Sequence, residues 1–70
     1  MKMCDANAYL YENGQEELIM ESVDKVVSKH SKVYLENIYG FRKTFEGRIK
    51  ELLLMDHRII LENFPHKQEL

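Results

Sequence analysis

The 70-residue sequence predicts an all-β protein built as a small antiparallel barrel of six or seven short strands. Apolar residues recur mainly with a period of two, which is the period of a strand. The pair Asn13-Gly14 is a strong hairpin signal, because both residues tolerate the positive φ of a type I′ turn. No segment shows a convincing helical pattern. Rolling such a sheet into a barrel removes the exposed edges that invite aggregation.

The first hairpin is predicted from the run ANAYLYE, residues 6–12, in which apolar and polar positions alternate. One face carries Ala6, Ala8 and Leu10. The run ends at Asn13-Gly14, so the next apolar segment, EELIM at residues 16–20, is expected to return antiparallel to the first.

The middle of the chain predicts a second hairpin and a long alternating strand. Residues 24–30 and 32–39 form the hairpin, joined around Ser31. The segment FRKTFEGRIKEL, residues 41–52, then alternates clearly. The face expected in the core carries Phe41, Phe45, Gly47 and Ile49. Lys43 interrupts this face, which indicates that the first part of the strand is an edge or a bulge.

The last pair of strands is predicted at residues 51–55 and 58–62, with a turn at Asp56-His57. Asp suits such a turn because its side chain can bond the backbone ahead of it. A helical turn over ELLLM is the less favoured alternative. Pro65 and the polar residues after it predict a loose tail at residues 63–70, which leaves one domain at residues 4–62.

The size of the chain and its one cysteine limit how it is stabilised. A chain this short buries only about 60% of its unfolded surface. Small domains often gain stability from disulfides, metals or self-association, and Cys4 alone cannot form an internal disulfide. The lone thiol suits a reducing compartment. Because the longest apolar run is only Leu52 to Met55, against the ~20 residues of a membrane span, a soluble, cytoplasmic protein without a membrane partner is expected.

Charge is unevenly distributed along the chain, although its net value is only −2. From Asp5 to Asp24 the acidic residues have no Lys or Arg among them; they are Asp5, Glu12, Glu16, Glu17, Glu21 and Asp24. From residue 41 to residue 50 the balance reverses, with Arg42, Lys43, Arg48 and Lys50 against Glu46. Such segregation favours complementary self-association or a modest anionic partner. A solvated face is the simplest role for Glu16, Glu17, Glu21 and Asp24, and docking to a basic surface of a partner is the alternative.

Two long stretches carry a resemblance to a known family. MCDANAYLYENGQEELIMESVDKV and GFRKTFEGRIKELLLMDHRIILE resemble the CooT family of small nickel-binding accessory proteins, over positions that run from Met3 to Glu62. The resemblance implies an SH3-like barrel that forms a homodimer and binds Ni(II) through its N-terminal cysteine, here Cys4. It also implies a nickel enzyme as client, such as carbon monoxide dehydrogenase.

The residues before Cys4 depart from the family pattern, in which the cysteine directly follows the initiator Met. Here Met1 and Lys2 precede the pair Met3-Cys4. If Met3 is the start and is removed, the amine and the thiolate of Cys4 can chelate together. If the chain starts at Met1, the thiolate and nearby amides remain. A two-fold dimer would bring two Cys4 thiolates together, and thiolate with backbone nitrogen suits four-coordinate Ni(II). A packing role for Cys4 is the alternative.

Other candidate residues are less favoured. Histidine is a common metal ligand, but the positions of His30, His57 and His66 in turns or in the tail favour exposed, unliganded side chains. The main rival function is RNA binding through the basic strand at residues 42–50, with Arg42, Arg48 and Lys50 on one face. Against nucleic acid stand the negative net charge and the expectation that the phenylalanines of this strand fill the core. A docking subunit that binds no metal is the third class.

No arrangement typical of an enzyme is visible in the sequence. It contains no nucleophile with an adjacent base and no glycine-rich phosphate loop, and a barrel of this size leaves little depth for a substrate pocket. A non-enzymatic role is therefore expected.

Overall fold

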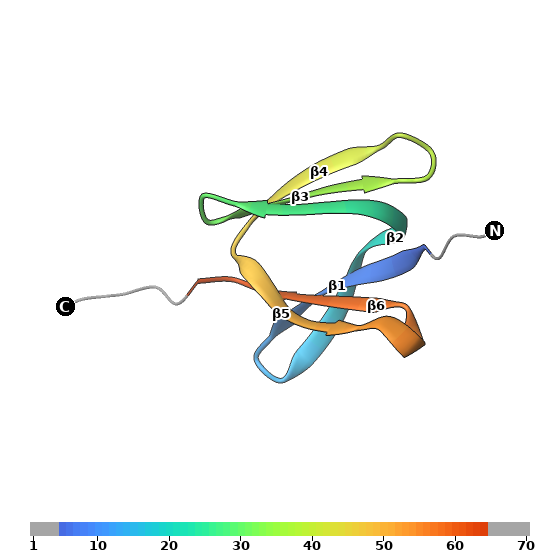
Figure 1. Cartoon of the computed structure of the whole chain (residues 1–70). Coiled ribbons are helices and arrows are strands. Elements are labelled where there is room, and N and C mark those ends of the chain that lie inside the picture. Colours follow the sequence, from blue (N-terminus) through green and yellow to red (C-terminus); the bar gives the residue numbers. More distant parts are fainter. Residues whose placement is uncertain (1–4, 65–70) are drawn as a thin grey trace.

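The computed structural model describes residues 5–64 and contains six strands and one short 3-10 turn (Figure 1). The elements are β1 (Ala6–Glu12), β2 (Gln15–Lys29), β3 (Lys32–Asn37), β4 (Arg42–Glu46), β5 (Arg48–Leu53), η1 (Leu54–Asp56) and β6 (Arg58–Glu62). The expected all-β architecture is confirmed. The predicted division into a domain at residues 4–62 and a tail at residues 63–70 stays a prediction.

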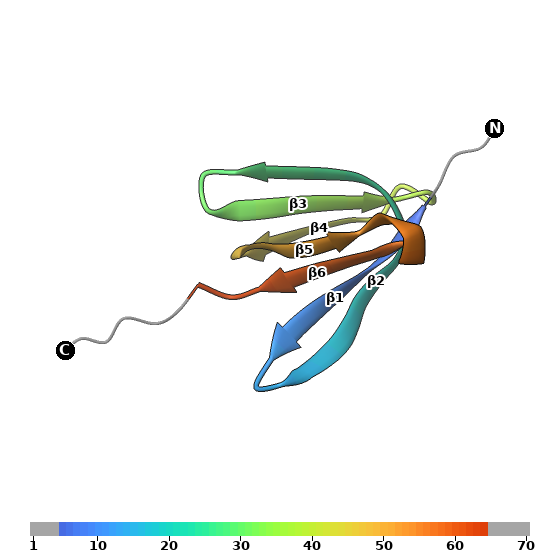
Figure 2. The same cartoon turned by 60° about the horizontal axis from the view of Figure 1, so that its bottom comes forward.

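The strands form a single sheet in the order β4-β3-β2-β1-β6-β5. Four of the five neighbouring pairs are antiparallel, whereas β1 and β6 run parallel, with Ala8 opposite Ile59 and Leu10 opposite Leu61. The parallel pair places the last strand beside the first, which turns a chain of local hairpins into a rolled sheet. Figures 1 and 2 show β4 and β5, from the two ends of the strand order, meeting at a shared corner.

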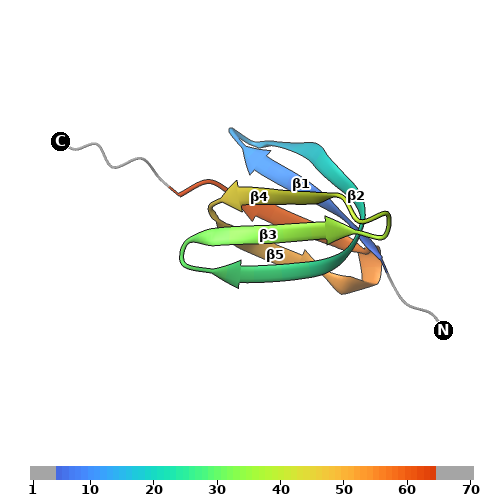
Figure 3. The ribbon, with the colours of Figure 1, turned by 90° about the horizontal axis from the view of Figure 1, so that it is seen from above.

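One strand replaces two predicted ones at the centre of the sheet. Residues 16–20 and 24–30 were expected as separate strands, but residues 16–20 and 24–29 both belong to β2, which wraps around one end of the barrel (Figure 3), and His30 lies in the turn after it. Ser22, at φ 55°, lies within this continuous strand, and the register against β1 and β3 shifts on either side of it. Such irregularities bend a strand strongly. β2 therefore pairs with β1 through its first half and with β3 through its second half.

The predicted strand at residues 41–52 is divided at Gly47. Its first part, β4, lies at one end of the strand order, which confirms the edge position indicated by Lys43, and its second part, β5, lies at the other end. The Gly47 N–H donates to the carbonyl oxygen of Ser31 at 3.1 Å. The alternation of apolar and polar residues continues through Gly47, although the chain passes there from a strand that pairs with β3 to a strand that pairs with β6.

The segment before β6 also differs from the expectation. The predicted strand at residues 51–55 ends at Leu53, and residues 54–56 form the 3-10 turn η1. The less favoured helical turn is therefore partly present. His57 closes it in the left-handed conformation, at φ 56° and ψ 46°, and donates its N–H to the Leu54 carbonyl oxygen at 3.2 Å. This reversal allows β6 to begin at Arg58.

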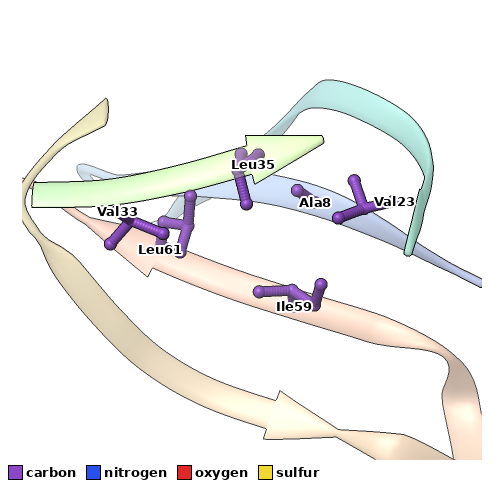
Figure 4. Close-up of a cluster of buried hydrophobic side chains, with 6 residues drawn as sticks. All are labelled: Ala8, Val23, Val33, Leu35, Ile59 and Leu61. Atoms are coloured by element: carbon purple, nitrogen blue, oxygen red, sulfur yellow. The ribbon is translucent and has the colours of Figure 1, made fainter. Parts of the chain in front are cut away.

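The core lies between the two halves of the rolled sheet. Figure 4 shows its side chains facing one another from β1, β2, β3 and β6. They are Ala8, Val23, Val33, Leu35, Ile59 and Leu61. Phe45 and Ile49 pack against this cluster as predicted, but Phe41 remains 67% exposed, contrary to the expectation. Phe41 precedes β4 in a turn, where the Asn37 side chain accepts a hydrogen bond from its N–H, so the alternation does not yet apply to it.

Candidate functional site

Cys4, the predicted metal ligand, lies outside the described residues, and the first described residue, Asp5, is bonded directly to it. The candidate site is therefore the end of the barrel where β1 begins. Two hydrogen bonds fix Asn7 at this end: its N–H donates to the His57 carbonyl oxygen at 2.9 Å, and its Oδ1 accepts from the Ser22 N–H at 3.2 Å. Asn7 thus joins the start of β1 to the bend of β2 and to the turn before β6.

A polar pocket of about 400 Å³ lies at this point. Asp5, Asp56 and His57 bring two carboxylates and an imidazole to its lining, beside Arg58. The turn Asp56-His57 was predicted from the sequence, but its position beside the chain segment that follows Cys4 was not. That position depends on the parallel pairing of β1 with β6, which local sequence patterns do not reveal.

The cation in this pocket already has partners on the outer face of the sheet. Arg58 forms an ion pair with Glu16, and its guanidinium lies 4.6 Å from the centre of the Tyr9 ring. Glu16 is therefore not simply solvated, as predicted for the acidic group, because it joins β2 to β6 across β1.

Next to the polar pocket, an apolar groove of about 450 Å³ opens at the same end of the barrel. Ala6, Val26, Leu52 and Leu54 contribute to its lining. Leu52 is 51% exposed and Leu54 is 76% exposed. Leu52 and Leu54 therefore place exposed apolar side chains at this end of the barrel. The location of the groove at the start of β1 places it beside the residue to which Cys4 is bonded.

Within residues 5–64, no group of three His, Cys, Asp or Glu side chains is close enough together to hold a metal ion. His30 and His57 are exposed, as predicted. His66 lies outside the described residues. The pocket at Asp5, Asp56 and His57 therefore supplies oxygen and nitrogen atoms near the start of β1 without forming a complete site there.

The basic strand proposed for RNA binding is not a single strand. Arg42 lies on β4, which pairs with β3, whereas Arg48 and Lys50 lie on β5, which pairs with β6. Arg48 pairs with Glu62 at 2.6 Å. Lys50 lies 5.0 Å from the centre of the Tyr11 ring. The cations on β5 therefore bind the protein's own side chains, and this geometry does not favour RNA along residues 42–50.

Within residues 5–64, no helix is long and apolar enough to cross a membrane.

Comparisons with known proteins identify relatives over most of the chain. A family model described as CO dehydrogenase accessory protein CooT matches residues 3–62. The uncharacterized protein MJ1551 of Methanocaldococcus jannaschii is 42% identical over 60 residues, which cover 86% of this chain and 98% of that protein. A crystal structure assigned to CooT from Carboxydothermus hydrogenoformans has a TM-score of 0.82 and 44% identity, and the match covers 89% of this chain and 100% of the other.

Proposed function

The chain belongs to the CooT family of CO dehydrogenase accessory proteins, and we propose that it binds Ni(II) and delivers it to a nickel enzyme such as carbon monoxide dehydrogenase. As an accessory protein of this maturation pathway, it is not itself an enzyme. The observation that carries the nickel proposal is the position of the only thiol, Cys4, directly before Asp5. Asp5 lies at an end of the barrel that has both a polar pocket and an exposed apolar groove.

The proposed metal site uses Cys4 from two copies of the chain. One thiolate alone is a poor site, but a two-fold axis near Cys4 would double each donor. Two thiolates and two backbone nitrogens provide four donors, and such mixed sets suit Ni(II) in tetragonal geometry. Delivery to a client also requires that the metal can leave, which a site near an exposed end of the barrel would permit.

The apolar groove at Ala6, Leu52 and Leu54 is the proposed dimer contact. Leu52 and Leu54 are exposed there, beside Asp24, His57 and Arg58, and burying such apolar side chains favours association by about 25 cal/mol per Å² before the costs of binding. A two-fold contact at this end would bring the two copies of Asp5, and with them the two Cys4 residues, to the same interface. We propose that the homodimer works in the cytoplasm, where a reducing environment keeps the thiol available.

Native mass spectrometry with and without Ni(II) tests this function, because it reports subunit number and metal content together. The expected species is a dimer that gains one nickel ion, and thiolate-to-metal charge transfer should appear in the absorbance spectrum. Cys4→Ser is the matched variant, since it replaces sulfur by oxygen with little change in volume. Nickel binding that survives this substitution unchanged would reject Cys4 as the ligand.

A further inference from the structure

A second exposed groove, which shares no lining residue with the apolar groove at Leu52 and Leu54, lies between the first half of β2 and the turn that joins β3 to β4. Its volume is about 390 Å³. Figures 1 and 3 show this turn beside the bend of β2, and the Ile38 N–H donates to the Ser22 carbonyl oxygen at 2.9 Å where the two segments meet. The groove is lined by Leu18, Ile19, Met20, Glu21, Asn37, Tyr39 and Phe41.

The turn holds two aromatic side chains in the solvent. Tyr39 is 72% exposed and Phe41 is 67% exposed. The backbone beneath them is nevertheless fixed, because the Asn37 Oδ1 accepts hydrogen bonds from the Tyr39 and Phe41 N–H groups, both at 3.0 Å. The Gly40 N–H also donates to the Asn37 carbonyl oxygen at 3.0 Å. Aromatic side chains on a preorganised backbone lose little conformational freedom on binding, and aromatic residues are frequent binding hot spots.

The other wall of the groove is an unpaired strand edge. Residues 15–23 of β2 pair with β1, whereas pairing with β3 begins only at Val23. In the described part of the chain, no strand therefore pairs with the outer edge of residues 16–21. An exposed edge of this kind can accept an extended polypeptide as an additional strand, with main-chain hydrogen bonds supplying affinity and neighbouring pockets supplying specificity.

The charge along this edge selects the partner. Glu17 and Glu21 are exposed on the same half of β2, and the sequence has no Lys or Arg between Asp5 and Asp24. A second copy added at the same edge would bring acidic strands together, which is unfavourable. Phosphate groups of a nucleic acid would meet the same repulsion. Lys or Arg side chains of a different chain would instead complement the edge.

We propose that this groove binds an extended segment of a partner protein in which apolar side chains alternate with Lys or Arg. The segment would pair with the outer edge of β2, and its apolar side chains would contact Leu18, Tyr39 and Phe41. We assign this segment to the client enzyme, and that assignment rests on the proposed function, whereas the groove and its chemistry do not depend on nickel.

The probe for this proposal is an end-blocked octapeptide that alternates Lys and Val, added to the full-length, ¹⁵N-labelled protein. We expect amide shifts concentrated at residues 17–21 and 37–41. Phe41→Ala and Glu21→Lys should each weaken binding by about tenfold, as expected for a contact at a hot spot. Both side chains are exposed, so neither change removes a core contact. Met55→Ala, which removes a 94% exposed apolar side chain outside this groove, is the matched control and should leave the affinity unchanged.

Main-chain pairing is tested with two further peptides, one N-methylated at every Val and the other at every Lys. In an added strand, alternate N–H groups point to the same side. The peptide whose methyl groups replace the hydrogens that face β2 should therefore lose binding, and the other peptide should bind normally. Equal binding of both peptides, or shifts located elsewhere, would overturn the proposal. So would tight binding of the matched Glu-Val peptide, or of oligouridine in place of the Lys-Val peptide. A change of subunit number in Phe41→Ala would assign the groove to a second copy.

Nickel binding is measured on the same variants so that the two proposals are separated. Phe41→Ala should retain nickel, and Cys4→Ser should retain the peptide. Loss of only one activity in each variant would show that the groove and the metal site act independently, and failure of either test leaves the other interpretable.

Discussion

Gly47 lies directly against the backbone of Glu62. A β-carbon at residue 47 would stand 3.2 Å from the Glu62 carbonyl carbon and closer still to its oxygen, and it would also come within 2.6 Å of a Phe45 ring carbon. The close approach occurs where β4 passes into β5. The end of β6 therefore occupies the space that a side-chain methyl group at residue 47 would need.

Gly47→Ala is therefore expected to destabilise the fold. Because the nearest atom belongs to the backbone rather than to a flexible side chain, relief requires movement of β6 or of the corner. Overpacking of this kind costs about 1–3 kcal/mol, and each kcal/mol lowers the Tm of a domain this size by about 4–8 °C. Thermal unfolding followed by circular dichroism measures the change.

Gly14→Ala provides the comparison for this experiment, since a β-carbon there meets no atom within 4 Å and only the positive φ of 78° opposes it. It should cost about 1–2 kcal/mol through the left-handed conformation alone. If Gly47→Ala were as stable as the wild type, the close approach to Glu62 would have no energetic importance.

Asn37 is expected to control the shape of the turn that displays Tyr39 and Phe41. Asn37→Ala removes the oxygen that accepts both N–H groups, and a net loss of about 1–2 kcal/mol follows for two hydrogen bonds. In this variant, amide hydrogen exchange at Tyr39 and Phe41 should accelerate relative to the wild type and should be faster than exchange at residues of β3. Asn37→Asp keeps the accepting oxygen and should preserve slow exchange, so equally fast exchange in both variants would contradict the role of this side chain.

The ion pair between Glu16 and Arg58 is expected to contribute little to stability. Both side chains are partly exposed, at 36% and 34%, and exposed pairs typically couple by about 0.2–1 kcal/mol. A double-mutant cycle with Glu16→Gln and Arg58→Gln, measured by urea unfolding, should give a coupling energy in that range. The coupling should shrink in 1 M salt, where screening acts over about 3 Å. A coupling that salt leaves unchanged would indicate that packing of Arg58 on Tyr9 dominates instead.

Local sequence patterns predict the strands better than they predict the sheet. The alternation in residues 6–12 and the pair Asn13-Gly14 specify the first hairpin correctly, because a two-residue turn and its flanking strands are set by neighbouring residues. The division at Gly47 was not predicted, because its cause is the backbone of Glu62, fifteen positions away. The bend at Ser22 is likewise fixed by contacts with Asn7 and Ile38.

The candidate site, too, could be predicted from the sequence only where it depends on local residues and not where it depends on strand pairing. Cys4 is proposed as the metal ligand from its residue type and from the family pattern, and both are visible in the sequence. The proximity of Asp5 to His57 arises from the parallel pairing of β1 with β6, which joins the two ends of the domain. The exposure of Phe41 could not be inferred from alternation, since the Asn37 side chain holds it in a turn before the strand begins.

Leu54→Glu tests whether the apolar groove at the start of β1 forms the dimer. Leu54 is 76% exposed in one chain, so a charge there should leave the folded monomer stable. In a two-fold interface it would bury two carboxylates in apolar surroundings, which is costly unless each finds a partner. Sedimentation velocity should therefore show a monomer at concentrations where the wild type is a dimer.

Val27→Glu introduces the same charge at another partly exposed apolar position, on β2 and outside this groove, and should leave the dimer intact. If nickel is shared between two Cys4 thiolates, Leu54→Glu should also weaken nickel binding although it leaves Cys4 in place, because separated monomers provide one thiolate each. A monomeric Leu54→Glu variant that binds nickel as tightly as the wild type would show that a single chain suffices, and the shared site would then be wrong even if the dimer contact is right.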